Sequence, residues 1–254
     1  CCTLTVPTSV VKLNLRGSVR RVSLVGAEHL IALGLQRGID FTVPTAKLNM
    51  LKCFGTTLTT HSTPFAISEL TTLSVVDLLI DTIGRNVRFP TSLTKLKARI
   101  SHGVFELDSL TPLTQLRSLK IDADNYPDDV SHLSFLTKLG TKYPPTSGFP
   151  TTLVWLDVRL SSNYDFSSLT RLTRLKVILD HGVRLVFPTQ LKELSIDEGW
   201  NLDACNVGEV ALERLICRGA PIQRATLEKL PKTIRTVSSD FDPPSLVACL
   251  TELF

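Results

Sequence analysis

The chain repeats one short pattern of hydrophobic and polar positions along its whole length. Each copy contains Leu-x-x-Leu followed by one polar and one apolar position, as in Leu172-Thr-Arg-Leu-Lys-Val177. We call the second leucine of each copy the anchor. The position three residues before each assigned anchor is apolar, and the anchors recur on average every 20 residues (240 residues over 12 intervals). They are assigned to Leu13, Leu33, Leu51, Leu73, Leu96, Leu119, Leu139, Leu156, Leu175, Leu194, Leu215, Val237 and Leu253.

The residues around each anchor predict a short β-strand with one buried face. Polar and apolar positions alternate there with period two, which is the period of a half-buried strand. The inward position two residues after the anchor is apolar in most copies and fails at Thr141 and Ser239. A single short strand is not stable alone, but copies stacked about 4.8 Å apart build a parallel sheet over one continuous core. The pattern therefore predicts a solenoid with about 12–13 strands.

The segments between strands are of two kinds. Some copies carry a proline six residues before the anchor, as in Phe89-Pro-Thr-Ser-Leu93, Phe149-Pro-Thr-Thr-Leu153 and Phe187-Pro-Thr-Gln-Leu191, and others lack it. The two kinds mostly alternate, which indicates a unit of about 40 residues. About 15 residues leave little room for a full helix, so proline copies predict extended connections. Proline-free copies such as Ser109 to Leu116 predict short turns of helix.

These motifs resemble the leucine-rich-repeat superfamily, and the apolar-Pro-Thr-Ser-Leu-x-x-Leu starts are similar to the BspA-like and FNIP-type repeats. The resemblance implies an α/β repeat solenoid over residues 1–254: a horseshoe with one parallel sheet and a mostly extended or short-helical convex side. The family's asparagine is missing, since its position holds Ser101, Asp124, Ser161, Asp180, Gly199 and Ala220. A β-propeller, the alternative for a 40-residue repeat, needs four strands per repeat, whereas this chain offers one per 20 residues.

Catalytic, cofactor-binding and metal-binding motifs are missing from the sequence. It contains no His-Glu-x-x-His, Gly-x-Ser-x-Gly or phosphate-binding glycine loop. Cys53 and Cys217 occupy inward positions and read as core residues. The six cysteines form no Cys-x-x-Cys pair and no glycosylation sequon is present, which together favour an intracellular setting. We therefore expect a non-enzymatic protein without a cofactor or metal.

The outward strand positions carry the candidate binding site. In proteins that this chain resembles, ligands commonly bind at the residues one before, one after and three after the anchor. Over the first 12 copies these 36 positions hold 14 basic and five acidic residues. The central copies are the most one-sided, with Asp122 as the single acidic residue among them. The predicted partner-binding residues are Lys95, Lys97, Arg99, Lys120, Lys138, Lys142, Trp155, Arg159, Arg174 and Lys176.

This basic face predicts a scaffold that binds a protein with an acidic surface. Nucleic acid or anionic lipid is the alternative, ranked lower because only Trp155 and Phe54 are aromatic on this face. A second alternative is the repeat domain of a larger protein, such as a ubiquitin-ligase adaptor or phosphatase regulator. The segment Arg85-Asn-Val-Arg-Phe89 fits a phosphatase-docking pattern, although the following proline favours Phe89 as core. Homo-oligomerisation through apolar solenoid ends is also expected.

Overall fold

The computed structural model divides into two compact units. Unit 1 comprises Cys1–Leu136 with Pro145–Ser147, and unit 2 comprises Thr137–Pro144 with Gly148–Phe254. Each unit is considered by itself. The structure describes residues 3–15, 21–23, 27, 29–36, 40–42, 49–58, 71–83, 89–100, 110–123, 129–145, 147–180, 182–197, 205–219 and 227–239.

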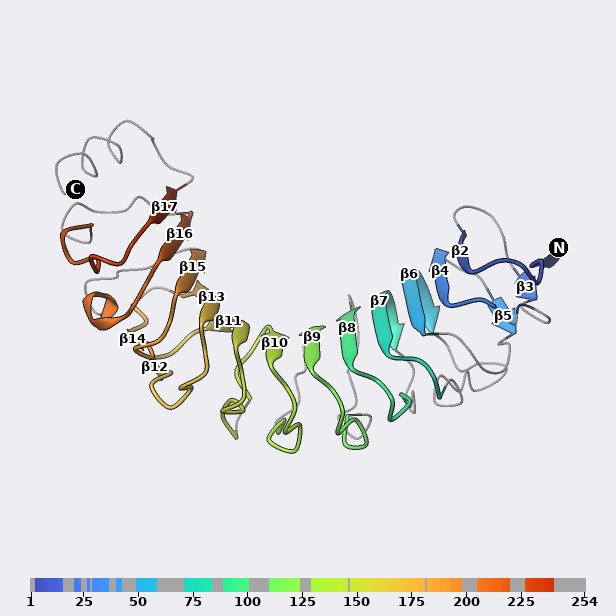
Figure 1. The fold of residues 1–254 in the computed structure, drawn as a ribbon, viewed down its shortest axis with the longest axis horizontal. Coiled ribbons are helices and arrows are strands. Elements are labelled where there is room, and N and C mark those ends of the chain that lie inside the picture. Colours follow the sequence, from blue (N-terminus) through green and yellow to red (C-terminus); the bar gives the residue numbers. More distant parts are fainter. Residues whose placement is uncertain are drawn as a thin grey trace. The chain divides into compact units, whose positions relative to one another are not determined.

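Unit 1 is built on a run of parallel strands (Figure 1). Neighbouring strands follow in chain order, and each pairs with the next in parallel register. A second parallel sheet of three strands joins β1 (Thr3–Thr5), β3 (Arg21–Ser23) and β5 (Asp40–Thr42). The main strands are β2 (Lys12–Leu15), β4 (Ala32–Gln36), β6 (Met50–Leu58), β7 (Val75–Ile83), β8 (Lys95–Ile100) and β9 (Ser118–Asp122).

Unit 2 repeats this arrangement with its own parallel strands in chain order. A two-stranded parallel sheet of β12 (Tyr164–Asp165) and β14 (Leu185–Val186) lies within the connecting segments. The main strands are β10 (Lys138–Thr141), β11 (Trp155–Leu160), β13 (Arg174–Leu179), β15 (Glu193–Asp197), β16 (Arg214–Arg218) and β17 (Thr236–Ser239).

The strand register confirms the repeat at every described anchor except one. In unit 2, Leu156 lies beside Leu175, and Leu194 lies beside Leu215. The last assigned anchor, Leu253, lies outside the described residues.

The exception is in unit 1, where the residue in register with Leu96 is Val76, so the assignment of Leu73 as an anchor is wrong. Leu73 takes the position three residues earlier. The sequence expectation failed because the interval between Leu51 and Val76 is 25 residues, longer than the mean.

The inward side chains of each unit form an apolar ladder. Leu156, Leu175, Leu194 and Leu215 are each at most 1% exposed, and their partners three residues earlier are equally buried. Burying each such leucine contributes about 1.5–3 kcal/mol, so the ladder is the main source of stability. Among the described residues Thr141 is the buried polar exception, and its hydroxyl donates to the carbonyl of Tyr143 at 2.6 Å. That hydrogen bond offsets the cost of placing a hydroxyl in the core.

The connecting segments explain why two kinds of repeat exist. In proline copies the carbonyl of Pro90, Pro150 or Pro188 accepts a hydrogen bond from the leucine three residues later, closing one β-turn. In proline-free copies two such turns follow one another. The amide of Leu113 donates to the carbonyl of Leu110, and the amide of Leu116 donates to that of Leu113. Each proline therefore replaces one of two local turns.

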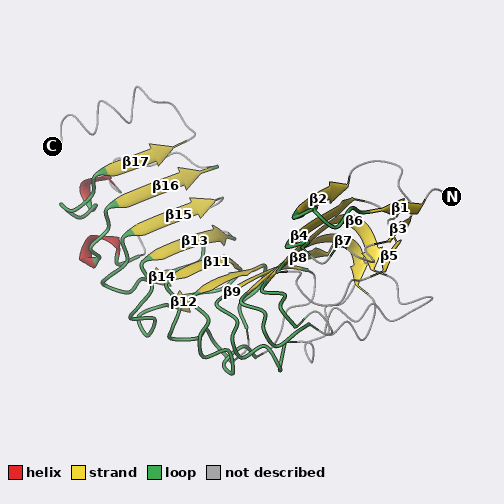
Figure 2. Cartoon of the chain, turned by 45° about the vertical axis from the view of Figure 1, so that its right-hand side comes forward, coloured by secondary structure: helices red, strands yellow, loops and turns green. Residues whose placement is uncertain are grey.

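The connections contain little helix, in contrast to the short helical turns expected from the proline-free copies (Figure 2). Residues 110–116, in one of those copies, form turns. Helical geometry among the described residues is limited to the 3-10 turn η4 (Val207–Glu209) and residues 227–228. The α/β description is not confirmed. The described part of the chain forms a parallel β-solenoid in which turns and extended segments join the strands.

Candidate functional site

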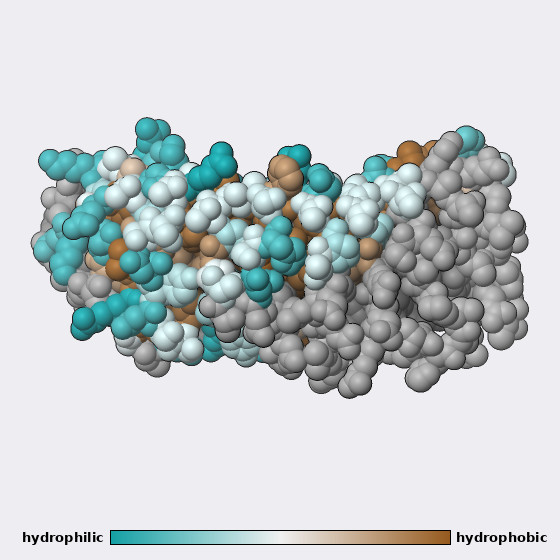
Figure 3. Space-filling model, turned by 90° about the horizontal axis from the view of Figure 1, so that it is seen from below, coloured by the Kyte–Doolittle hydropathy of each residue, from teal (hydrophilic) through white to brown (hydrophobic). Residues whose placement is uncertain are grey.

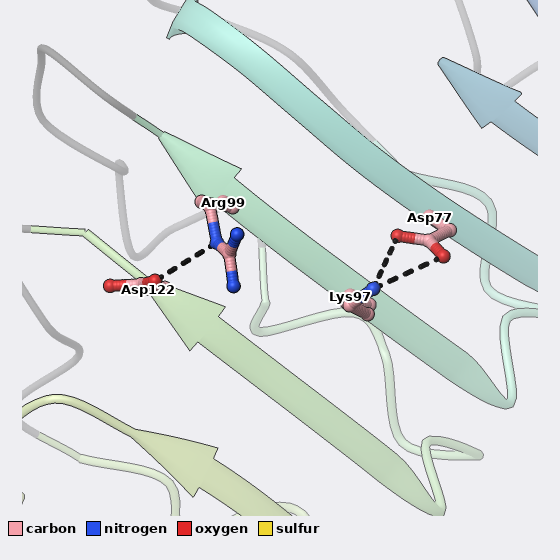
Figure 4. Close-up of polar contacts among 4 residues, drawn as sticks. All are labelled: Asp77, Lys97, Arg99 and Asp122. Atoms are coloured by element: carbon pink, nitrogen blue, oxygen red, sulfur yellow. Dashed lines mark hydrogen bonds and ion pairs between the residues drawn. The ribbon is translucent and has the colours of Figure 1, made fainter. Parts of the chain in front are cut away.

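The outward strand face of unit 1 is less one-sided than the sequence predicted. Because Val76 is the true anchor of β7, Asp77 takes an outward position beside Lys97. The Lys97 ammonium lies 3.3 Å from the Asp77 carboxylate, as Figure 4 shows. The misassigned register had hidden this anion. The central cations were expected to have Asp122 as the single acidic residue among them, and that expectation is wrong because Asp77 pairs with Lys97.

A second ion pair joins β8 to the next strand. The Arg99 Nε lies 3.1 Å from a carboxylate oxygen of Asp122, and both side chains are about half exposed (Figure 4). The β8 side chains therefore pair in both directions, Lys97 with β7 and Arg99 with β9. Lys95 is exposed and, among the described residues, has no anionic side chain at ion-pair distance. Lys120 is half-buried in the same face of β9.

In unit 2 the outward charges form chains of pairs across neighbouring strands. Glu193 lies between Arg174, at 3.6 Å, and Arg214, at 3.9 Å. Lys176 pairs with Asp197 at 3.0 Å. The pairs of Arg174 and Arg214 with Glu193 are partly exposed, and exposed pairs stabilise a fold by only about 0.2–1 kcal/mol each.

One further pair holds Arg159 at the end of β11. Its guanidinium lies 3.0 Å from the Asp180 carboxylate, and both side chains are more than 40% exposed. The outward basic residues of unit 2 are therefore mostly engaged with acidic neighbours. Five of the ten residues predicted as a binding site are in ion pairs: Lys97, Arg99, Arg159, Arg174 and Lys176.

The part of the unit 2 face formed by β10, β11 and β13 combines cations with aromatic rings. Lys138, Trp155 and Arg174 lie next to one another on β10, β11 and β13, in one row across the strands. Lys138 and Arg174 are exposed and Trp155 is half-buried. Lys142 places its ammonium 5.4 Å from the centre of the Tyr143 ring, whose side chain is 42% exposed. Lys138 has no acidic partner among the described residues.

The residues that sequence reasoning missed have identifiable signals. Asp77 follows from reading Leu73-Ser-Val-Val-Asp-Leu78 as the repeat core, with Val76 as a valine anchor. Asp180 lies five residues after the anchor Leu175, outside the three positions counted as outward. Tyr143 lies just after β10, beyond the counted positions. The acidic partners of Lys97, Arg99 and Arg159 come from neighbouring repeats, 20 to 23 residues away along the chain.

The described residues offer no arrangement typical of a catalytic or metal site. They contain no cluster of three or more histidine, cysteine or acidic side chains able to hold a metal ion. Burial raises the pKa of the Cys217 thiol to about 12, so it stays protonated as a core residue. The side chain of Cys53 lies outside the described part of the chain.

The suspected phosphatase-docking motif is described only at its last residue. Phe89, its hydrophobic end, is 2% exposed and lies in the core, whereas residues 84–88 lie outside the described residues. A phenylalanine buried in this way serves packing, as the repeat proline beside it indicated.

The connecting segments present mainly polar residues to solvent. In Figure 3 the coloured part of the view is mostly pale or hydrophilic, and brown residues appear between the polar ones. Apolar side chains such as Leu110, Leu113 and Leu116 point inward from the turns and are buried. Among helices of the described residues, none has the length and hydropathy to cross a membrane.

Comparisons with known proteins identify the fold. No family model and no curated protein matches the chain. Among solved structures, an internalin (InlF) of Listeria monocytogenes matches with a TM-score of 0.57 and 18% identity, covering 91% of this chain and 74% of that one. The functional domain of InlJ from the same organism, described as including a cysteine ladder, matches with a TM-score of 0.49 and 17% identity. It covers 97% of this chain and 68% of that one. The match to InlF shows that the described residues of this chain form a repeat solenoid of the leucine-rich-repeat type.

Proposed function

We propose that this protein is a non-enzymatic interaction scaffold that binds an acidic protein surface with the outward face of its strands. The observation that carries the proposal is an excess of cations over anions on the described part of this face. The outward face of unit 1 carries more cations than anions. Its anions are Asp77 and Asp122, and its cations are Lys12, Lys95, Lys97, Arg99 and Lys120. The outward face of unit 2 has the same excess. Its anions are Asp157, Asp180, Glu193 and Asp197, and its cations are Lys138, Lys142, Arg159, Arg174, Lys176, Arg214 and Arg218.

The excess is concentrated in particular residues. Lys95 in unit 1 and Lys138 in unit 2 are exposed and lack an ion-pair partner among the described residues. An incoming carboxylate meets each of these lysines without first breaking an existing pair. Complementary charge of this kind speeds association and selects partners more than it adds affinity.

Charge reversal tests the proposal directly. Lys95→Glu, Lys97→Glu and Lys138→Glu combined should weaken capture of an acidic polypeptide of mixed charge by about tenfold or more at about 50 mM salt, where screening is weak. The probe is a random copolymer of glutamate, alanine and lysine with a net negative charge. The melting temperature should stay nearly constant because exposed charges contribute little to stability. The matched control reverses three exposed cations elsewhere, Arg171, Arg184 and Arg235. Equal loss in both variants, or unchanged binding in the first, would contradict the proposal.

Nucleic acid is distinguished in the same titration by salt. Binding of an oligonucleotide to several cations falls linearly with the logarithm of salt concentration, with a steep slope. Asp157, Glu193 and Asp197 lie among the cations of unit 2 and repel a uniformly charged polymer. They tolerate a protein surface of mixed charge, which is why we favour a protein partner.

The proposal includes two further expectations. An intracellular setting rests on the cysteine pattern and on the missing sequons of the sequence. Self-association through the solenoid ends rests on Leu13 in β2 and Val237 in β17, which are half-buried where their interior counterparts are buried. Light scattering run beside the binding titration reports on self-association.

A further inference from the structure

The row Lys138–Trp155–Arg174 is the part of the outward face best suited to anchor a partner. Lys138 pairs in register with Trp155, and Trp155 pairs in register with Arg174. All three lie one residue before their anchors, so their side chains leave the same face of unit 2. A half-buried tryptophan between two exposed cations combines apolar contact area with charge. Tryptophan and arginine are among the residues that most often dominate protein interfaces.

The spacing of this row restricts the shape of the partner. Adjacent strands lie about 4.8 Å apart, so Lys138 and Arg174 are separated by about 9.6 Å at the backbone. An α-helix laid across the strands rises about 4.5–6.0 Å between residues three or four apart, and about 10.5 Å over seven. Side chains on one face of an extended chain recur about every 6.8 Å, a spacing that does not match the row.

We propose, resting on the scaffold function above, that unit 2 binds an acidic amphipathic helix laid across β10, β11 and β13. Such a helix carries an acidic residue, an apolar residue three or four positions later, and a second acidic residue seven positions after the first. The apolar side chain packs on Trp155, and the two carboxylates meet Lys138 and Arg174. These three side chains lie on one face of the helix, because residues three, four and seven positions apart are one or two helical turns apart.

The charges around the row agree with this partner. Arg174 already shares Glu193 with Arg214, at 3.6 and 3.9 Å, so it keeps capacity for a second carboxylate. A guanidinium has five N–H donors and is able to serve two acids at once. Asp157, two residues after Trp155 on β11, favours a neutral or basic residue on the flank of the helix. The site is therefore selective for a helix with acids at defined positions rather than for negative charge in general.

Two synthetic peptides test the geometry. The matched peptide has glutamates at positions i and i+7 and a leucine at i+3, in an alanine–glutamine background that favours helix. The mismatched peptide has the same composition, with the second glutamate moved to the opposite face. Fluorescence anisotropy at about 50 mM salt, where screening is weak, should show the matched peptide binding about tenfold more tightly. Trp155→Ala and Lys138→Glu should each abolish this preference, whereas the control Arg235→Glu, with the same charge change as Lys138→Glu, should keep it.

The possible results separate this inference from the scaffold function. Equal binding of both peptides, lost in the Lys95, Lys97 and Lys138 triple variant, overturns the helical partner and leaves the acidic-partner scaffold standing. Binding of neither peptide overturns the helical partner, and the acidic-polypeptide titration above then decides the scaffold function on its own. Tighter binding of a single-stranded oligonucleotide of similar charge overturns both. Circular dichroism of each variant confirms that it is folded, so that a loss of binding is not a loss of structure.

Discussion

The inner and outer faces of the strands in unit 2 use the same register for opposite purposes. Leu156 and Leu175 meet on the inner face and are at most 1% exposed, while Trp155 and Arg174 meet one residue earlier on the outer face. On the inner face each described anchor of unit 2 is apolar, because a truncated side chain there leaves a cavity. On the outer face the side chains vary, because exposed charge has little effect on stability. The comparison shows how stability and recognition are separated within single strands.

The largest effect on the free energy of unfolding is expected from truncating a side chain on the inner face. Leu156→Ala removes a fully buried side chain between Leu139 and Leu175, and should lower the free energy of unfolding by about 2–5 kcal/mol. Urea denaturation followed by circular dichroism measures it. The control is Asp157→Ala, the next residue on the outer face, for which we expect a change within about 0.5 kcal/mol. Similar losses in both variants would show that the two faces are not separated in the way we describe.

A smaller effect is expected at the polar exception in the core. Thr141→Val keeps the shape of the side chain but removes the hydroxyl that donates to the Tyr143 carbonyl and accepts from the Tyr143 amide at 3.2 Å. We expect a loss of about 1–3 kcal/mol, because two polar backbone groups lose a partner. Thr173→Val is the control, since its hydroxyl makes only a 3.4 Å contact with the Val154 carbonyl in a more exposed place. Thermal unfolding compares them, and a stabilised Thr141 variant would rule out this role.

The smallest effect is expected for an outer ion pair. A double-mutant cycle with Arg159→Ala and Asp180→Ala should give a coupling energy of about 0.2–1 kcal/mol, because both side chains are more than 40% exposed. The coupling should fall in about 1 M salt, where charges are screened within about 3 Å. A coupling above about 2 kcal/mol, near the upper end of what contacting residues show, would mean that outer pairs also hold the fold. The contrast between the two faces would then weaken.

Much of the fold was predictable from the sequence, and the one misplaced anchor has a clear cause. The inward alternation around Leu96, Leu156 or Leu194 reflects burial, which each residue's own hydrophobicity signals locally. Leu73 was mistaken for an anchor because it too is apolar and fully buried. Leu73 and Val76 are both apolar and buried, so only the spacing of the anchors could distinguish them. That spacing is a safe guide only where every repeat has the same length, and this repeat is longer than the mean.

The candidate site was less predictable, because its properties belong to pairs of strands. The sequence shows that Lys97, Arg99 and Arg159 are basic and outward, but it does not show which acids they meet. Their partners are Asp77, Asp122 and Asp180, which lie 20 to 23 residues away along the chain. The misplaced anchor of β7 removed Asp77 from the predicted face. Local pattern thus predicts which side chains point outward, whereas the register of neighbouring strands decides which of them meet.

By itself the sequence determined the repeat, the strand at most anchors and the inward and outward faces of each strand, because these follow from hydrophobicity and a period of two. Only the tertiary structure decided the anchor at Val76, the turns in place of helices, and the pairing of charges across strands. The physical reason is that hydrogen bonds between stacked strands set the alignment of residues in successive repeats. That alignment also placed Trp155 between Lys138 and Arg174.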